Sequence, residues 1–324
     1  MNKKIAIVSP VYNDWDSYFQ LVNEIKNCHS GLDVMIDMFA IDDGSDEVRD
    51  VPEGGHFSEG NITRLEVLHL IHNMGHQRAI AIGLSEVFQR EHYDAVVVMD
   101  ADGEDRPEDV FKLIQAFLED PNRIVVAQRT KRSEGWLFRR LYALYKLLFR
   151  GLVGTRVDFG NFCILPSFAL ERLAFDSNTW NHLAAAIIRS NLPFRRIQTE
   201  RGVRYSDRTK MSLEPYVIHG LSAMSVFSDR VFVRIMIVFA LLAFLAFCGI
   251  IAVIWIRLFT DLAIPGWATS TVGILLLIAF QALLFLGIAS FTLLYQRTSP
   301  SLIPARDAPK YIRSRKILFS NDGA

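Results

Sequence analysis

The sequence predicts an α/β domain with a mainly parallel sheet, followed by two apolar helices that form a hairpin. Three observations support this fold class. Short apolar segments alternate with segments of helical periodicity over the first 130 or so positions. Acidic residues follow the ends of the predicted strands. Two uncharged stretches in the last third of the chain are long enough to cross a bilayer.

The predicted elements of the first half alternate between strand and helix. The strands are residues 4–8, Val34–Ile41, Leu65–Leu70, Ala95–Met99 and 124–128, and the helices are Asp14–Asn27, Gln77–Arg90 and one that Pro107 opens. Proline suits the first turn of a helix because it lacks the backbone N–H. This alternation predicts helices on both faces of the sheet. Parallel sheets of this kind bind ligands beyond the carboxyl ends of their strands.

Charge and cysteine content exclude several classes of protein. The chain carries 35 basic and 35 acidic residues, so no global charge favours nucleic-acid binding. Cys28, Cys163 and Cys248 are widely spaced, which argues against a disulfide framework or a zinc site and favours a reducing compartment. The N-terminal segment has too few apolar residues for a signal peptide, so we expect this domain in the cytosol.

The last third of the chain predicts a membrane hairpin. Uncharged runs at Ile235–Ile256 and Ala268–Tyr295 are separated by a short loop that contains Pro265 and Gly266. We expect a domain at 1–212, a juxtamembrane segment at 213–230, membrane helices at 231–258 and 268–295, and a basic cytosolic tail at 296–324. Basic residues gather at the base of the hairpin and in the tail, so the positive-inside rule predicts a multi-pass inner-membrane protein with both termini in the cytoplasm.

A further amphipathic segment lies between the two parts. Residues 136–152 carry Arg139, Lys146 and Arg150 on one helical stripe, and the other positions are mostly aromatic or aliphatic. This pattern predicts a helix that lies in a membrane interface. The alternative is an ordinary amphipathic helix that packs on the domain.

The stretch Asp100-Ala101-Asp102 follows a buried strand and is the strongest chemical signal. Side chains alternate along an extended backbone, so both carboxylates lie on one side. Such oxygen ligands suit Mg²⁺ or Mn²⁺, which usually share a site with substrate phosphates. The alternative is a solvated acidic turn.

Four segments in order carry a resemblance to a known family: Val8–Asp14, Ile41–Ser45, Asn73–Gln77 and Asp100–Asp102. Together they resemble family 2 glycosyltransferases with the GT-A fold, a Rossmann-like nucleotide-diphospho-sugar transferase domain. With the predicted hairpin, the chain is similar to polyisoprenyl-phosphate glycosyltransferases of the dolichol-phosphate-mannose-synthase and bactoprenol-glucosyltransferase type. The resemblance covers roughly residues 4–300.

The resemblance implies a function and a set of site residues. It implies inverting, metal-dependent transfer of a sugar from a UDP- or GDP-linked donor to a polyprenyl phosphate, with Mg²⁺ or Mn²⁺, in a homo-oligomer that binds the membrane and no nucleic acid. Nucleotide contacts fall on Pro10, Tyr12, Asp14, Asp43, Gln77, Asp100 and Ala101; metal contacts fall on Asp100, Asp102 and Glu104; Arg129 lies near the phosphates. Many relatives have glutamine at the position of Glu104.

One segment departs from the family. Asn161 stands where the family usually has the aspartate proposed as catalytic base, and Asp158 lies nearby. The second pKa of a lipid monophosphate is about 6, so most of the acceptor is dianionic at pH 7 and hardly needs a base. We therefore expect Asn161 to position the acceptor, with Asp158, Arg129 and Asp102 as further catalytic candidates.

A basic segment before the hairpin resembles an arginine-rich stretch of the family. Arg204 and Lys210 are the candidates for binding acceptor or donor phosphate. The alternative is attraction of a basic segment to anionic lipid.

Two other functions stay open from the sequence. A processive polysaccharide synthase shares the catalytic fold, but it carries a Gln-x-x-Arg-Trp motif and more membrane spans, which this sequence lacks. A non-catalytic, membrane-anchored partner that binds nucleotide sugar would explain Asn161, but it would not need the acidic pair.

Overall fold

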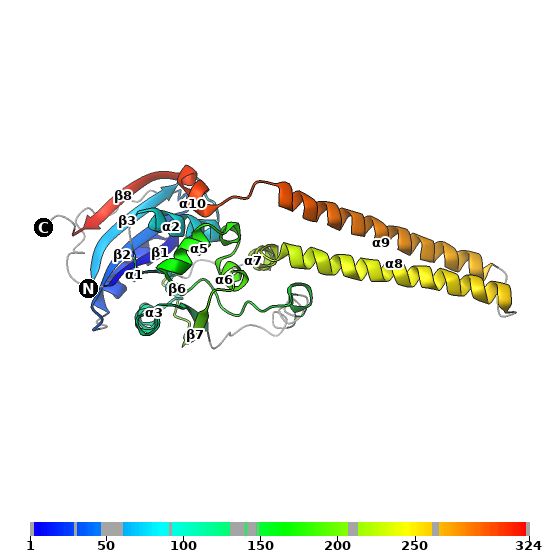
Figure 1. Cartoon of the computed structure of the whole chain (residues 1–324). Coiled ribbons are helices and arrows are strands. Elements are labelled where there is room, and N and C mark those ends of the chain that lie inside the picture. Colours follow the sequence, from blue (N-terminus) through cyan, green and yellow to red (C-terminus); the bar gives the residue numbers. More distant parts are fainter. Residues whose placement is uncertain are drawn as a thin grey trace. The chain divides into compact units, whose positions relative to one another are not determined.

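The computed structural model describes residues 3–28, 31–46, 61–90, 93–129, 140, 147, 149–206, 213–260 and 266–321. The chain divides into two compact units (Figure 1). Unit 1 comprises residues 1–136, 157–226 and 301–324, and unit 2 comprises residues 137–156 and 227–300. Unit 1 therefore contains both ends of the chain.

The described part of unit 1 is built on an eight-stranded sheet with the order β7-β5-β6-β4-β1-β2-β3-β8. The strands are β1 (Lys3–Val11), β2 (Val34–Asp42), β3 (Ile62–Leu70), β4 (Ala95–Val98), β5 (Ile124–Arg129), β6 (Cys163–Pro166), β7 (Phe194–Thr199) and β8 (Ile312–Ser320). Strands β4, β1, β2 and β3 run parallel, and so do β5 and β7. Strands β6 and β8 are antiparallel to their neighbours. The predicted mainly parallel α/β sheet is confirmed.

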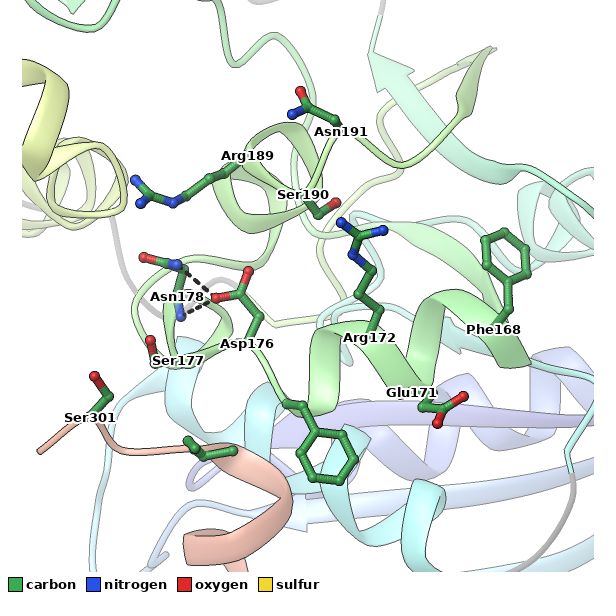
Figure 2. A pocket seen from close by; sticks show the side chains of 12 residues that line it. Phe168, Glu171, Arg172, Asp176, Ser177, Asn178, Arg189, Ser190, Asn191 and Ser301 are labelled. Atoms are coloured by element: carbon green, nitrogen blue, oxygen red, sulfur yellow. Dashed lines mark hydrogen bonds between the residues drawn. The ribbon is translucent and has the colours of Figure 1, made fainter.

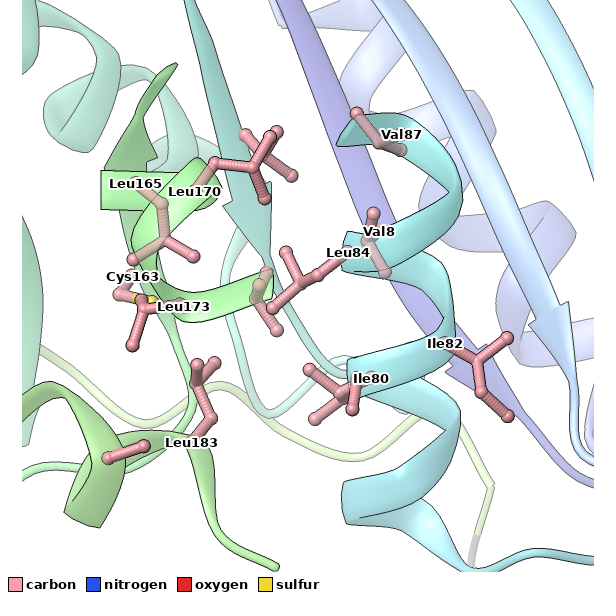
Figure 3. Close-up of a cluster of buried hydrophobic side chains, with 14 of the residues drawn as sticks. Val8, Ile80, Ile82, Leu84, Val87, Cys163, Leu165, Leu170, Leu173 and Leu183 are labelled. Atoms are coloured by element: carbon pink, nitrogen blue, oxygen red, sulfur yellow. The ribbon is translucent and has the colours of Figure 1, made fainter. Parts of the chain in front are cut away.

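Helices cover both faces of this sheet (Figure 1). Alternation along β1 shows why: Ile5 and Ile7 belong to one buried cluster, and Ala6 and Val8 belong to the other. The first cluster includes α1 (Trp15–Asn27) and α3 (Pro107–Glu119), and the second includes α2 (His76–Arg90), α5 (Ser167–Ala174) and α6 (Leu183–Arg189). Figure 3 shows part of the second cluster, with side chains such as Leu84 of α2 and Leu173 of α5 in one buried group. Unit 1 also contains η1 (Ser177–Trp180) and α7 (Leu213–Ser225).

The C-terminal residues complete the sheet of unit 1. After α10 (Pro304–Asp307) and η2 (Ala308–Tyr311), strand β8 pairs with β3, and Leu65 lies opposite Phe319. Ser85 of α2 donates a hydrogen bond to the carbonyl of Pro304 at 2.9 Å. From residue 301 on, the segment that the sequence analysis treated as a basic tail is therefore part of the α/β domain. In this edge strand, Arg313, Arg315 and Lys316 interrupt the apolar residues, so periodicity does not reveal it.

Unit 2 contains a pair of long apolar helices, α8 (Ser228–Phe259) and α9 (Trp267–Thr298). They pack side by side, and the rings of Phe239 and Phe285 stack with their centroids 4.9 Å apart. Their mean hydropathies are 3.1 and 2.6, and both are long and apolar enough to cross a membrane. Most of their side chains are exposed, so they are not core helices of this chain.

The predicted interfacial segment at 136–152 is only partly described. Its residues 140, 147 and 149–152 are helical, and the others lie outside the described residues. Within unit 2, Arg234 of α8 donates a hydrogen bond to the carbonyl of Gly151 at 2.6 Å, and Phe149 packs edge-on against Phe227. These contacts hold the C-terminal end of the segment next to α8. Its location in a membrane interface stays a prediction.

Candidate active site

The ends of β1 and β2 lie beside the loop that follows β3. The backbone N–H of Asp43 donates to the carbonyl of Val11 at 2.8 Å. Its carboxylate accepts hydrogen bonds from the backbone of Met74 at 2.6 Å and of Gly75 at 2.9 Å. Burial raises the pKa of Asp43, and these two backbone hydrogen bonds oppose that rise. Asp43, a predicted nucleotide contact, therefore also fixes the loop between β3 and α2.

Gly44 allows this close approach of the two loops. Its φ of +73° lies in the left-handed region, and a Cβ atom there would lie 2.5 Å from the carbonyl carbon of His72 and 2.6 Å from the amide nitrogen of Asn73. Both the backbone angle and the lack of space exclude any larger residue.

Asp42 and His69 form a second contact at this edge, which the sequence analysis did not identify. They lie opposite each other in the β2–β3 register, and Nδ1 of His69 is 2.7 Å from Oδ2 of Asp42. The backbone N–H of Ser45 donates to Oδ1 of Asp42 at 3.0 Å. Burial alone would raise the pKa of Asp42, but the hydrogen bonds from His69 and Ser45 outweigh it and lower that pKa. The sequence did contain a signal for this contact, because one predicted strand has a histidine near its end and the preceding predicted strand is followed by an aspartate.

The loop between β4 and α3 gathers several carboxylates. The backbone N–H of Asp100 donates to Oδ2 of Asp105 at 2.9 Å, and that of Glu104 donates to Oδ1 of Asp102 at 3.0 Å. Burial, together with the charge of Asp100, raises the pKa of Asp105 to about 7. The same two causes raise the pKa of Asp102. The loop therefore places several carboxylates close together, as a binding site for a positively charged group does.

Glu104 is the centre of an arginine cluster, defined here as Glu104 with Arg129, Arg201 and Arg204. Its Oε2 accepts from Nη1 of Arg129 at 3.0 Å, and its Oε1 accepts from Nε of Arg204 at 2.6 Å and from Nη2 of Arg201. The Glu104 side chain is 8% exposed. Burial alone would raise the pKa of Glu104, but the three guanidinium groups outweigh it and lower that pKa.

The segment after β7 brings two of these arginines to the acidic loop. The backbone N–H of Gly202 donates to the carbonyl of Glu104 at 2.9 Å, and that of Tyr205 donates to the carbonyl of Asp102 at 3.0 Å. The Tyr205 hydroxyl donates to Glu24 of α1 at 2.5 Å. Nε of Arg204 also lies 3.1 Å from Oδ2 of Asp102. Arg204 was predicted from the sequence as a phosphate contact, whereas Arg201 and Tyr205, which lie in the same basic segment, were not.

His76, Asp100 and Asn161 form a third group at the carboxyl edge. Nε2 of His76 lies 3.3 Å from Oδ1 of Asp100 and 3.2 Å from Nδ2 of Asn161. Burial alone would lower the pKa of His76, but the charge of Asp100 outweighs it and raises that pKa. Oδ1 of Asn161 is buried, and none of the described residues forms a hydrogen bond to it. The predicted acceptor-positioning residue is thus beside the acidic pair.

Two predicted residues contact other parts of the fold. The carboxylate of Asp158 accepts hydrogen bonds from Gln128 at 3.1 Å and from Arg196 at 3.2 Å, so it lies with β5 and β7. No contact between Asp158 and Asn161 is among those of the described residues. Oε1 of Gln77 accepts from the backbone N–H of Leu183 at 2.9 Å, at the start of α6.

The remaining predicted residues lie around the end of β1 or near the acidic loop. The Tyr12 side chain is 48% exposed, and Pro10 is half-buried. Asp14 accepts a hydrogen bond from Ser17 at 2.7 Å, and Ala101 is buried. Lys210 lies outside the described residues.

The carboxylates of Asp100 and Asp102 fit a divalent cation, whereas Glu104 does not. Oδ1 of Asp100 is buried, and Nε2 of His76 lies 3.3 Å from it. A cation would relieve the repulsion between these two acids and could complete its coordination with water and phosphate oxygens. The Glu104 oxygens accept hydrogen bonds from arginines. Among the described residues, no group of three or more His, Cys, Asp or Glu side chains is arranged to bind a metal ion. The Glu104 carboxylate thus binds arginines in this structure, whereas the sequence had predicted it as a metal ligand.

Comparison with known proteins finds relatives that match most of this chain. The chain is 24% identical over 323 residues to glycosyltransferase YkcC of Bacillus subtilis (strain 168), which covers 98% of this chain and 95% of the relative. It is 26% identical over 292 residues to the undecaprenyl-phosphate 4-deoxy-4-formamido-L-arabinose transferase of Sodalis glossinidius (strain morsitans), with 88% and 84% covered.

A solved structure and a family model also match. Mannosyl-3-phosphoglycerate synthase from Rubrobacter xylanophilus superposes with a TM-score of 0.48 at 18% identity, covering 70% of this chain and 74% of that one. The model of glycosyl transferase family 2 matches residues 6–179, which include the acidic loop, His76 and Asn161. This match spans more than half of the 324 residues and agrees with the GT-A fold predicted from the sequence, so the chain belongs to glycosyl transferase family 2.

Proposed function

We propose that the protein transfers a sugar from a nucleotide diphosphate sugar to a polyprenyl phosphate at the cytosolic face of a membrane, with inversion at the anomeric carbon. The observation that carries this proposal is the arginine cluster around Glu104, next to the acids of the β4–α3 loop. Arginines of this kind suit phosphate groups, because the planar guanidinium offers several donors. The relatives named as undecaprenyl-phosphate transferases support the choice of acceptor.

The donor diphosphate would bind at the acidic loop. Arg129 and Arg204 would donate to its oxygens, and the nucleoside would extend toward Asp43 and the end of β1. Because Glu104 already gathers these guanidinium groups, little rearrangement is needed when the diphosphate arrives. Preorganised donors of this type stabilise the charge that builds on a departing diphosphate.

Asp100 and Asp102 would hold a divalent cation, Mg²⁺ or Mn²⁺. When bound, such an ion neutralises negative charge on the leaving group. The protein's own contribution is to bring two carboxylates together, with the pKa of Asp102 already raised by burial and by Asp100. A bound cation would shift this carboxylate toward its charged form.

The acceptor phosphate would approach beside Asn161. About nine-tenths of a lipid monophosphate is dianionic at pH 7, because its second pKa is about 6. Such a nucleophile needs positioning more than deprotonation. The side chain amide of Asn161 can donate to the phosphate, and Arg204 with Lys210 would balance its charge. Asp158 contributes little in this arrangement, because its carboxylate is bonded to Gln128 and Arg196.

The apolar helices α8 and α9 would place this reaction at the membrane surface. Their length and composition fit a membrane hairpin, and the basic residues at its base favour an orientation with both termini in the cytoplasm. A hairpin of this type could also pair with that of a second copy, which would make the protein a homo-oligomer.

The proposal is tested with membranes that contain the full-length protein. Radiolabelled sugar from UDP- and GDP-linked donors should enter organic-extractable lipid, and chelation of divalent cations should stop the transfer. The rate of sugar transfer by Asp102→Asn should be at least about a hundredfold lower, which is the effect expected when one preorganised charge-stabilising group is removed.

Asp120→Asn is the matched control, because this aspartate lies just after α3 at the protein surface and binds only neighbouring residues. It should transfer sugar at the wild-type rate. Transfer that persists unchanged in Asp102→Asn would refute the metal assignment. Nucleotide-sugar binding without any transfer to polyprenyl phosphate would refute the proposed reaction.

A further inference from the structure

Unit 1 contains an open pocket of about 760 Å³ that shares no residue with the candidate active site (Figure 2). Its walls come from α5, from η1, from the turn after α6 and from the segment that precedes α10. Three of these segments lie within residues 168–191, and the fourth, at Ser301 and Ile303, lies more than a hundred positions later, so the pocket is formed by the fold and not by one local turn.

The pocket offers several donors to a ligand with acceptor oxygens. The Arg172 side chain points into it (Figure 2), and no hydrogen bond or ion pair of the described residues engages its guanidinium. Asn191 lines the same wall and adopts a left-handed φ of 54°, whereas the hydroxyl of Ser190 donates to the carbonyl of Ile187 at 2.7 Å. The Asp176 carboxylate is turned to Asn178, from which it accepts hydrogen bonds at 2.9 and 2.7 Å. Arginine, amide and hydroxyl donors together suit a phosphate group.

Both connections between unit 1 and the apolar helices reach this pocket. Arg189, in the pocket wall, donates a hydrogen bond to the carbonyl of Val226, which is the last residue of unit 1 before α8. Ser301, which also lines the pocket, is the first residue of unit 1 after α9. Because a membrane-spanning helix begins and ends near the lipid head groups, a pocket whose residues contact or include the chain positions next to α8 and α9 can meet a lipid head group.

The aromatic residues of the pocket fit the same environment. Phe168 and Phe175 are 39% and 55% exposed and add apolar surface to the pocket wall. Next to a bilayer, exposed aromatic rings can cover the glycerol and upper acyl carbons of a lipid. The pocket thus combines donors for a phosphate with apolar surface beside them.

We propose that this pocket binds the phosphate of a membrane phospholipid head group. Arg172 is the main phosphate contact, Arg189 is the second cation, and the ligand is a structural lipid distinct from the polyprenyl substrate. Glu171, on the same wall, offers a carboxylate to the ammonium of a zwitterionic head group. The inference rests on the membrane location proposed above, but not on the proposed reaction.

The test is lipid binding to the full-length protein, purified in detergent and titrated with phosphatidylglycerol or phosphatidylethanolamine. Native mass spectrometry counts the lipids that remain bound and gives the affinity of the tightest one. Arg172→Ala should weaken that tightest binding about tenfold or more, because a hydrogen bond to a charged group is lost. Arg172→Lys keeps the charge and should weaken it less.

Arg123→Ala is the matched control, since Arg123 is an exposed arginine of unit 1 that pairs with Asp120 outside the pocket. It should bind lipid as the wild type does, and lipids around the apolar helices should bind to all variants alike. Equal tight binding in Arg172→Ala would overturn the proposal. So would displacement of the lipid by millimolar inorganic phosphate, which would make the pocket a site for free anions. Nucleoside diphosphate binding by Arg172→Ala should equal that of the wild type, which separates this test from that of the reaction.

Discussion

Arg315 of β8 and Glu86 of α2 form a bidentate ion pair across 229 positions of the chain. Nε of Arg315 lies 2.8 Å from Oε1 of Glu86, and Nη2 lies 3.0 Å from Oε2. Arg90 of α2 donates to the same carboxylate at 2.6 Å. Burial alone would raise the pKa of Glu86, but the hydrogen bonds from the two arginines outweigh it and lower that pKa. The last strand is therefore joined to the domain by charge as well as by backbone pairing.

The first prediction is a loss of stability in Glu86→Gln that depends on pH. A carboxylate whose folded pKa is depressed stabilises the fold above its unfolded pKa, and this stabilisation is lost as the pH falls through the folded pKa. At pH 7 the variant should lose about 1–3 kcal/mol of unfolding free energy. The difference in thermal midpoint from the wild type should shrink as the pH falls below about 4.3, the ordinary pKa of glutamate.

Glu108→Gln is the control for this measurement, because Glu108 forms an exposed ion pair with Arg106. Exposed pairs contribute little, so its midpoint should match that of the wild type at every pH. A Glu86→Gln midpoint that stays equally low from pH 7 down to pH 3 would contradict the assignment.

The second prediction concerns Glu104→Gln. The substitution keeps the size of the side chain but removes the charge that three arginines share, and loss of one member of a buried charge cluster costs about 3–5 kcal/mol. The thermal midpoint should fall. Added UDP or GDP should then raise the midpoint more in the variant than in the wild type, because the phosphates replace the missing negative charge. The midpoints are measured in the presence of a chelator, so that no metal enters the comparison.

An identical midpoint in Glu104→Gln, or a smaller rise with nucleotide than in the wild type, would show that the arginines do not depend on this carboxylate. Asp120→Asn serves again as the surface control, and its midpoint should not move.

The third prediction separates two costs at Gly44. Gly44→Ala combines a left-handed backbone angle with a contact of 2.5 Å to the carbonyl carbon of His72. Gly31→Ala is a matched control, because Gly31 has a φ of +66° and an added Cβ there would meet no atom of the described residues within 4 Å. Gly31→Ala should cost about 1–2 kcal/mol, which is the backbone term alone.

Gly44→Ala should be clearly more destabilising than Gly31→Ala and should also weaken binding of nucleoside diphosphate, since the loop that Asp43 holds must move. Thermal unfolding and calorimetric binding measure the two effects. Equal midpoints for the two variants would mean that the loops can separate without cost.

The fourth prediction tests whether the reaction needs a base at position 161. Asn161→Asp should not accelerate sugar transfer at pH 7, because the added carboxylate would repel the acceptor phosphate near Asp100. Asn161→Ala should slow transfer about tenfold through loss of one hydrogen bond to a charged acceptor. Initial rates at several acceptor concentrations measure both variants. A large acceleration in Asn161→Asp would show that a base is useful after all.

The sequence predicted strands β1 to β5 but not β6, β7 or β8, for physical reasons. Strands β1, β2 and β4 are buried on both faces, so they read as continuous apolar runs. Strands β7 and β8 form the two edges of the sheet and carry exposed polar or charged residues, whereas β6 is buried between β5 and β4 but has only four residues, which include Cys163 and Pro166. Local composition identifies a buried strand, but an edge strand is defined mainly by its partner.

The site shows the same limit. The acids of the β4–α3 loop were predicted because they follow a buried strand directly. The arginine partners of Glu104 were not, since Arg201 and Arg204 lie 97 and 100 positions away. The contact of Asn161 with His76 spans 85 positions. Spacing in the sequence indicates which groups share a turn or a face, but not which distant loops meet.

The return of the chain into unit 1 after α9 determines the order in which the protein can be completed. Strand β8 follows both apolar helices in the chain, so the outer edge of β3 lacks its partner until both helices have been synthesised. An incomplete sheet edge is the kind of surface that pairs with other chains. Synthesis of the hairpin therefore comes before the pairing of β8 with β3 that completes the catalytic domain. A fragment that ends before the hairpin would lack β8, and the outer edge of β3 would stay unpaired.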